Sequence, residues 1–256
     1  RDGHVRLNTE VVVNDAEIGA KYVGDGSDIA TDAWKYRGNV YGAGRGIDKY
    51  DSDGNGTPDT YCSSAGSVTR NTHVIVNGGL IHRDVYGGGS LATVGPPPSP
   101  TYQAYDPSIT TVEIVGGTIG DATEHANEGV AKGYGGNVYG SGRGEIAAPG
   151  NALDKMATVK AAVVNIGSGT VDSGTGFASN LAGSALINGS VYGSGENGHV
   201  STNATINIFG GAVGDTTKNE VIINEYCGNV YGAGSGTDMY DSDNDDTPDA
   251  YNPKDL

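Results

Sequence analysis

The sequence predicts an all-β protein of about five stacked, equivalent coils, a β-solenoid that spans residues 1–256 as a single domain. Three observations predict this fold. A Val-Tyr-Gly-(small)-Gly stretch occurs five times, each copy follows a segment with the alternating β-branched residues of a strand, and helix signals are nearly absent. The five copies begin at Val40, Val85, Val138, Val191 and Val230.

The composition favours thin layers over one bulky core. Apolar residues make up 36% of the chain, and 44 residues are Gly, so few large side chains are available to fill an interior. The glycines have no Gly-X-Y period, which excludes collagen, and the regular recurrence of β-branched residues and Tyr argues against disorder. Coils with small cores and tight glycine corners fit this composition.

Each coil is predicted to contain three strands. The first is an alternating segment rich in β-branched residues, as expected for a strand with one buried face. These segments cover residues 9–14, 72–79, 111–117, 160–166 and 205–211. An apolar residue then predicts a short second strand at Ile18, Ile81, Ile119, Val171 and Val213. The Val-Tyr-Gly stretch forms the third strand.

Insertions are predicted at fixed corners of this frame. The second coil has only four positions from Ile81 to Val85, whereas the same step spans 22, 19, 20 and 17 positions in the other coils. A second corner, after the closing Gly, carries residues 48–59, 95–100 and 145–155. Variable loops at fixed corners are typical of solenoids. Residues 121–132 could form one short helix. The predicted repeat units span about 1–65, 66–109, 110–156, 157–202 and 203–256.

This pattern of repeated strands resembles the right-handed parallel β-helix, a family that includes secreted bacterial adhesins, passenger domains and polysaccharide-degrading enzymes. The resemblance covers almost the whole chain, without a catalytic motif. It implies coils about 4.8 Å apart, with equivalent side chains stacked in ladders. One ladder is predicted at Tyr41, Tyr86, Tyr139, Tyr192 and Tyr231. We interpret it as structural, and a flat aromatic strip for binding sugars is the alternative.

Val and Tyr of each stretch are predicted to face opposite sides of their sheet, one in the core and the other outside or in a side channel. The residue before Val should form a structural corner with its side chain bonded to the next coil. These residues are Asn39, Asp84, Asn137, Ser190 and Asn229. After the last Gly, Arg143 and Glu196 lie one coil apart, so an exposed ion pair of little energetic value is expected.

Two acidic loops, residues 51–59 and 241–249, carry oxygen donors at positions 1, 3, 5 and 9 and a backbone carbonyl at position 7. This spacing is typical of Ca²⁺ loops, with Gly56 allowing the turn at position 6, and it resembles thrombospondin type 3 repeats and dockerin-like modules. The predicted ligands are Asp51, Asp53, Asn55, Thr57, Asp59, Asp241, Asp243, Asp245, Thr247 and Asp249.

The bidentate Glu of an EF-hand is absent from both loops, since position 12 is Cys62 in the first and Asn252 in the second. Asp48 and Asp238, at matching offsets before the loops, could supply the missing ligand. A bound Ca²⁺ would then have a structural role and order a long insertion. The alternative is an acidic, solvated turn, because Asp, Asn and Gly favour turns in any case.

The two cysteines, Cys62 and Cys227, belong to the first and fifth coils. Four coil steps would separate these layers by about 19 Å, whereas a disulfide needs Cα atoms within about 7 Å. A bridge from Cys227 of one subunit to Cys62 of the next is therefore easier than an internal bridge, which would need long loops to move. The sequence leaves both pairings open.

Charge and composition limit the partners. The net charge of −16, from 31 acids against 15 bases, disfavours nucleic acid and anionic membranes and favours divalent cations. No apolar run is long enough to span a bilayer. Abundant Gly, Asn, Ser, Thr and Tyr suit an extracellular or cell-surface protein. Neither end shows a capping helix, so both ends are expected to continue into another subunit or into more of a longer protein.

We therefore expect a structural, extracellular, calcium-binding β-solenoid without enzymatic activity, which associates head to tail with itself as a filament or surface-stalk subunit. Two alternatives stay open. One is a polysaccharide-binding or polysaccharide-cleaving β-helix, which would need a groove of clustered charged side chains. The other is an adhesin that binds carbohydrate or another surface protein through loops such as residues 96–106.

Overall fold

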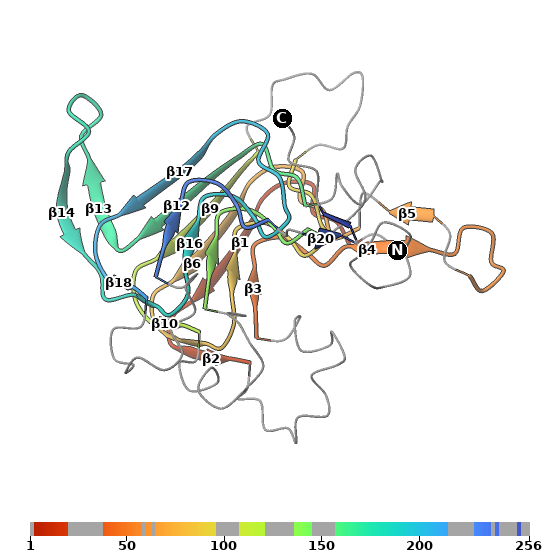
Figure 1. The fold of residues 1–256 in the computed structure, drawn as a ribbon, viewed down its shortest axis with the longest axis horizontal. Coiled ribbons are helices and arrows are strands. Elements are labelled where there is room, and N and C mark those ends of the chain that lie inside the picture. Colours follow the sequence, from red (N-terminus) through yellow and green to blue (C-terminus); the bar gives the residue numbers. More distant parts are fainter. Residues whose placement is uncertain are drawn as a thin grey trace.

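The computed structural model describes residues 3–19, 38–57, 60–62, 65–95, 108–120, 136–144, 157–214, 228–236, 239–240 and 250–251. These residues form a parallel β-helix of five coils, which confirms the predicted fold class (Figure 1). The five coils share three five-stranded parallel sheets. The described residues contain no helix long and apolar enough to cross a membrane.

The first sheet contains β1 (Thr9–Val13), β6 (Thr72–Val76), β9 (Ile109–Ile114), β12 (Ala161–Ile166) and β17 (Ala204–Ile208). The second contains β2 (Ala16–Ile18), β7 (Gly79–Ile81), β10 (Thr118–Ile119), β15 (Leu186–Ile187) and β18 (Ala212–Val213). The third contains the repeated stretch as β3 (Val40–Tyr41), β8 (Val85–Tyr86), β11 (Val138–Tyr139), β16 (Val191–Tyr192) and β19 (Val230–Tyr231).

The coils stack in a single register. In the third sheet, each Val pairs with Val and each Tyr with Tyr at every step. Two more ladders of single bridges complete the coil. One joins Val5, Val68, Val94, Val159 and Val200, and the other joins Arg45, Ser90, Arg143, Glu196 and Ser235. Equivalent residues of the repeat therefore lie above one another along the whole stack.

The core is a column of β-branched side chains. In β6, Val74 and Val76 are fully buried and alternate with the half-buried His73 and Ile75, as the period of two predicts. Equivalent valines and isoleucines from all three sheets form one cluster, and a smaller cluster lines the ladder of Val68. Because burying one such side chain stabilises the fold by about 1.5–3 kcal/mol, each thin coil contributes through a few residues.

Buried threonines join the first sheet to the third. The Oγ1 atoms of Thr9, Thr72 and Thr110 each donate to the carbonyl oxygen of the glycine after Tyr in the same coil. The acceptors are Gly42, Gly87 and Gly140, each at 2.5 Å. Alanine occupies this ladder position in the last two coils. The hydroxyls thus satisfy buried carbonyl groups across the interior of the first three coils.

The glycine after each Tyr is required by the close approach of the coils. A Cβ atom on Gly42 would lie 2.2 Å from the carbonyl oxygen of Gly87 in the following coil. For Gly87, Gly140 and Gly193 the same distance is 2.3 Å. No side chain larger than hydrogen fits at this position while another coil follows.

One strand assignment in the fourth coil is wrong. Val171 does not form the second strand, because β13 (Ser168–Val171) pairs antiparallel with β14 (Ala178–Ala182) in a projecting hairpin. The second strand is instead β15, whose Ile187 lies four residues before Val191. Ile187 is fully buried, whereas Val171 is 44% exposed. The insertion of this coil therefore lies between its first and second strands.

Two smaller hairpins flank the acidic loops. β4 (Ile47–Tyr50) pairs antiparallel with β5 (Thr60–Cys62), and β20 (Met239–Tyr240) pairs antiparallel with β21 (Ala250–Tyr251). In both the first and the fifth coil, an antiparallel strand pair thus brackets the acidic segment. The short helix suggested for residues 121–132 lies outside the described residues.

Candidate functional site

The five repeated tyrosines form one continuous stack. Successive ring centroids are 4.7, 4.8, 4.9 and 5.0 Å apart, and the ring planes are inclined by only 6–12°. Tyr86 and Tyr139 are buried, so the middle of the stack offers no flat exposed strip to a sugar. Val85, on the opposite face of the same strand, is also buried. Both faces of the third sheet are therefore interior, and the tyrosines occupy the side channel.

A ladder of short polar side chains runs beside the rings. Asn39 Oδ1 accepts a hydrogen bond from the Asp84 backbone N–H at 2.9 Å, and Asp84 Oδ1 accepts one from the Asn137 N–H at 2.8 Å. The pattern continues from Asn137 to Ser190 and from Ser190 to Asn229, at 2.9 and 3.1 Å. Each side chain thus binds the backbone of the coil that follows it.

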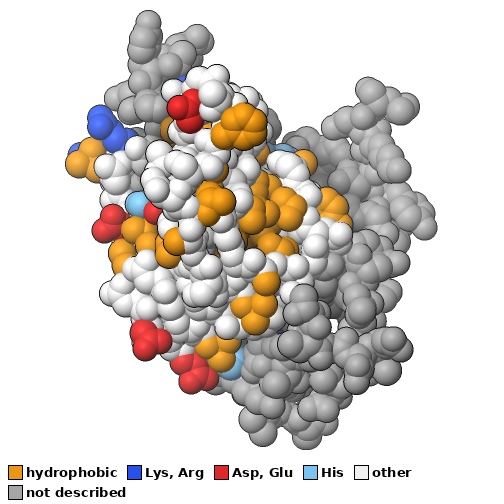
Figure 2. All heavy atoms as spheres, turned by 90° about the vertical axis from the view of Figure 1, so that its left-hand side faces the viewer, with side chains coloured by type: hydrophobic (Ala, Val, Ile, Leu, Met, Phe, Trp, Pro, Cys, Tyr) orange, Lys and Arg blue, Asp and Glu red, His pale blue; other side chains and the backbone are white. Residues whose placement is uncertain are grey.

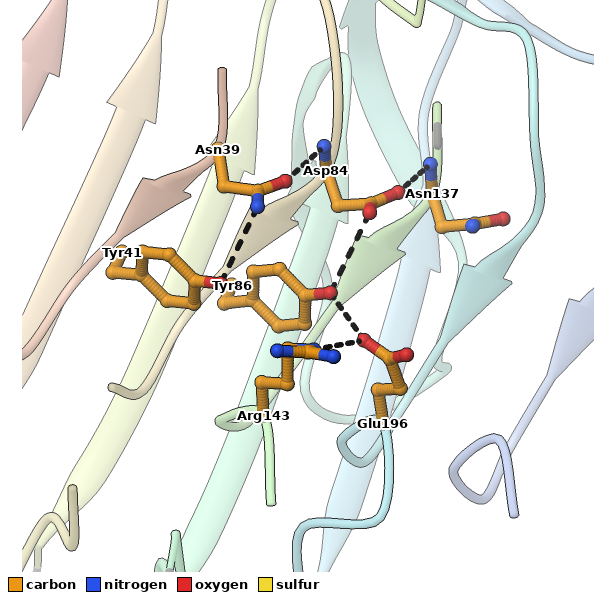
Figure 3. A network of polar contacts seen from close by, with 7 residues as sticks. All are labelled: Asn39, Tyr41, Asp84, Tyr86, Asn137, Arg143 and Glu196. Carbon is orange, nitrogen blue, oxygen red and sulfur yellow. Dashed lines mark hydrogen bonds and ion pairs between the residues drawn. The ribbon is translucent and has the colours of Figure 1, made fainter. Parts of the chain in front are cut away.

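Charged groups converge on the hydroxyl end of Tyr86 (Figure 3). The Tyr86 hydroxyl donates to Glu196 Oε2 at 2.5 Å and lies 3.5 Å from Asp84 Oδ2. Arg143 Nε donates to the same Glu196 oxygen at 3.1 Å. At the neighbouring rung, Asn39 Nδ2 lies 3.4 Å from the Tyr41 hydroxyl. We call Asp84, Tyr86, Arg143 and Glu196 the carboxylate network.

The Arg143–Glu196 pair differs from the expected exposed ion pair. Their side chains are only 13% and 25% exposed, respectively, because their ladder lies against the tyrosine stack. Two charges in this partly dehydrated position interact more strongly than charges at the surface. The pair also fixes the acceptor of the Tyr86 hydroxyl, which a surface pair would not do.

The surroundings raise the pKa of Asp84 into the neutral range. Burial of its carboxyl group, followed by the negative charge of Glu196, raises the pKa of Asp84 to about 7, although the N–H of Asn137 opposes this shift. Burial also raises the pKa of the Tyr86 and Tyr139 hydroxyls well above the usual value. The single Tyr86 proton bonds to Glu196, so a protonated Asp84 would in turn donate to the Tyr86 oxygen.

The carboxylate network bears on the polysaccharide alternative. Three charged side chains do converge, as a catalytic groove would need, but they converge on a ring that is 1% exposed. They contact one another, the Tyr86 hydroxyl and the backbone of the next coil. This arrangement favours a role in holding the second, third and fourth coils together.

The first acidic loop folds around Asp51. Asp51 Oδ1 accepts hydrogen bonds from the N–H groups of Gly54 and Asn55, at 2.6 and 3.1 Å, and Oδ2 accepts one from Gly56 at 2.6 Å. These bonds, that of Gly56 first, lower the pKa of Asp51. Gly54 and Gly56 have φ angles of 79° and 91°, which only glycine adopts easily. Asp53 and Asn55 complete the turn.

The other predicted ligands lie outside the residues whose side chains the structure describes. They are Asp48, Asp59, Asp238, Asp241, Asp243, Asp245, Thr247 and Asp249. The predicted disulfide cannot be followed either, because Cys227 and the side chain of Cys62 are also outside this part. Among the described residues, no group of three or more His, Cys, Asp or Glu side chains could hold a metal ion. The described half-loop supplies two carboxylates.

The last coil has an exposed edge. Val230 is 47% exposed and Tyr231 37%, whereas their equivalents Val85 and Tyr86 in the second coil are buried. Figure 2 views the side on which β17, β18 and the hairpin β13–β14 lie in Figure 1, and apolar side chains gather on this face. The hairpin β13–β14 adds Phe177 and Leu181 to the exposed apolar residues. The sequence predicted uncapped ends without singling out Val230 and Tyr231, and of the carboxylate network it predicted the Arg143–Glu196 pair alone.

Comparisons of the chain with protein-family models, with curated proteins and with solved structures found no match. The fold therefore rests on the strand pairing of the chain itself. The resemblance to adhesins and to dockerin-like loops stays a prediction.

Proposed function

We propose that the protein is a structural, calcium-binding β-solenoid of the extracellular space or cell surface, which associates end to end with copies of itself in a filament or surface stalk. One observation carries this proposal: the fifth coil repeats the stacking residues of the inner coils but leaves Val230 and Tyr231 exposed. An uncovered strand edge is a template for pairing with another chain, and large exposed apolar patches mark interaction sites.

Calcium would support such an assembly. The chain carries a net charge of −16, and copies that stack must overcome mutual repulsion. The loop that begins at Asp51 already turns its carboxylates inward on backbone N–H groups, with the donor spacing of a Ca²⁺ loop. A cation bound there would neutralise two carboxylates and fix the hairpin β4–β5 at one corner of the first coil.

Sedimentation velocity over a range of protein concentrations, with Ca²⁺ and with a chelator, tests the proposal. We expect a series of species larger than the monomer whose share grows with concentration and with Ca²⁺, and rods that lengthen in electron micrographs. A protein that stays monomeric at every concentration in both buffers would contradict end-to-end association.

One observation favours the adhesin alternative. Phe177 is 79% exposed near the tip of the hairpin β13–β14, which projects from the stack (Figure 1), and exposed aromatic residues often anchor partners. Binding of the protein to a panel of polysaccharides and surface proteins, compared with binding of Phe177→Ser, tests this role. Equal binding by both proteins would exclude the hairpin as the contact.

A further inference from the structure

We infer that the exposed edge of the fifth coil is the docking surface for the first coil of a second copy, which continues the parallel stack in the Val-Tyr-Gly register. This inference rests on the proposed function. It adds which surface of each copy is used, which residues meet and what sets the register between the two copies.

The fifth coil repeats a face that already accepts a coil inside the chain. Residues 39–44 and 229–234 have the same sequence, Asn-Val-Tyr-Gly-Ala-Gly. In the first coil the second coil covers this face: Val40 N–H and Gly42 N–H donate to the carbonyls of Asp84 and Tyr86, each at 3.0 Å. The fifth coil presents the same backbone groups in the same sequence, so its face has the donors that accept a parallel coil.

The glycines give an independent argument. A Cβ atom on Gly193, in the fourth coil, would lie 2.3 Å from the next carbonyl oxygen, whereas one on Gly232 would meet nothing within 4 Å. Gly236 repeats the contrast: its Cβ would also meet nothing, whereas one on Gly144 would lie 2.1 Å from Asn197 O. Two glycines without a steric reason inside the described stack therefore occur where a following coil would require them.

The first coil of a second copy offers the complementary groups. Each Val N–H of the third sheet donates to the carbonyl before the next Val at 2.9–3.0 Å, so Val230 N–H would meet the carbonyl of Asn39 in the second copy. Ser235 would lie beside Arg45, which repeats the internal step from Ser90 to Arg143. No like charges meet in this ladder.

The contact also buries apolar surface on both copies. Val5, 38% exposed in the first coil, would extend the ladder that ends at Val200. Val40 is already buried at 5%, so the first coil contributes its backbone and its Val5 segment more than its core valines. A heterologous contact of this kind does not close on itself, and it generates an open chain of copies.

The test compares the wild type with Gly232→Ala in sedimentation velocity. The variant is silent inside the monomer, so its melting temperature should stay within about 2 °C of wild type. Its Cβ would overlap the carbonyl of a docked coil, so the association constant should fall at least about tenfold. Gly174→Ala is the matched control, because its Cβ would meet only Asp172 Oδ1 at 3.4 Å, in the turn of the hairpin β13–β14 and outside the repeated coil.

A mixing experiment distinguishes the two ends. Gly232→Ala keeps an intact first coil, so it should add to the fifth coil of wild-type chains, end their growth and shorten the oligomers. Oligomers of wild-type length in the mixture would overturn the inference, as would association of Gly232→Ala equal to wild type, while leaving self-association intact. A wild type that stops at dimers would indicate pairing between fifth coils and also overturn it. A wild type that never associates would instead overturn the proposed function.

Discussion

Replacing Asp84 by Asn is expected to stabilise the protein above pH 7. Asn already occupies the same ladder position in three other coils, at Asn39, Asn137 and Asn229. Its Oδ1 would accept the Asn137 N–H as the carboxylate does at 2.8 Å. Its Nδ2 would face the Tyr86 hydroxyl, as Asn39 Nδ2 faces the Tyr41 hydroxyl. The variant thus keeps the contacts and removes a charge that burial disfavours.

The magnitude follows from the pKa of Asp84, which burial and Glu196 raise from 3.8 to about 7. The folded protein therefore holds the proton more tightly than the unfolded chain. Its contribution to stability is full below about pH 4, declines as the pH rises to about 7 and is constant above. One pKa unit corresponds to 1.36 kcal/mol, so the loss is about 2–4 kcal/mol after allowance for partial exposure. Asn avoids this loss.

Urea unfolding, followed by circular dichroism at pH 4, 5.5, 7 and 8.5, measures the difference between the variant and wild type. We expect almost no difference in the free energy of unfolding at pH 4 and the full difference at pH 8.5. Asp15→Asn is the control, because Asp15 is exposed and its removal changes net charge without touching the tyrosine stack. An equal gain at both extremes of pH, or a loss of stability at pH 8.5, would refute the reasoning.

Three more predictions follow from the same geometry. Thr72→Val should lower the free energy of unfolding by about 1–3 kcal/mol in urea titrations, because the carbonyl of Gly87 loses its buried donor. Glu196→Gln should lower the pKa of Asp84 in a carboxyl NMR titration, because the Glu196 charge raises it. Ca²⁺ at 100 times its dissociation constant should raise the melting temperature by about 5–10 °C, and Asp51→Asn should reduce its affinity in titration calorimetry.

Each of these has a control within the chain. Thr111→Val lies on the outer face of the first sheet and should leave stability unchanged, so an equal loss would contradict the role given to the buried hydroxyl. Asp172→Asn removes an aspartate that also accepts backbone N–H bonds in an exposed turn but lacks the spacing of a Ca²⁺ loop. If it weakened Ca²⁺ binding as much as Asp51→Asn, binding would reflect charge alone. An unchanged Asp84 pKa in Glu196→Gln would remove Glu196 as a cause.

The sequence repeats made the stacking of the coils predictable. Contacts between residues at different positions of the repeat could not be predicted from them. The recurrence of Val-Tyr-Gly fixes the pairing of Tyr41 with Tyr86, because equivalent residues of a solenoid stack. Val171 was misplaced because a β-branched residue at the expected distance carries the same signal in a hairpin as in a coil. The spacing from Ile187 to Val191 matched that from Ile81 to Val85 and could have corrected it.

The contact of Tyr86 with the carboxylate network could not be predicted from the sequence, for a different reason. Tyr86 and Glu196 are 110 residues apart, and their contact depends on which way the ladder of Arg143 faces. Nothing in the spacing of charged residues along the chain indicates that direction. The recurrence of Thr at the same position of three first strands could have indicated a shared role for its hydroxyl. The acceptor could not be predicted, because it follows a strand of another sheet.

The two kinds of ladder have different consequences for assembly. The Val-Tyr-Gly ladder has the same residues in every coil, so its backbone contacts do not distinguish one order of coils from another. The carboxylate network does distinguish them: Asp84 and Glu196 are each the single acid of their ladder, and with Arg143 they lie in consecutive coils. A chain that stacked its coils out of order would leave charges buried without partners. At the fifth coil, Val230, Tyr231 and Gly232 are exposed, and the described segment 228–236 carries no charged side chain. The interior therefore specifies one order of coils, while the edge carries no such restriction, and this is the combination that the proposed end-to-end assembly of identical copies needs.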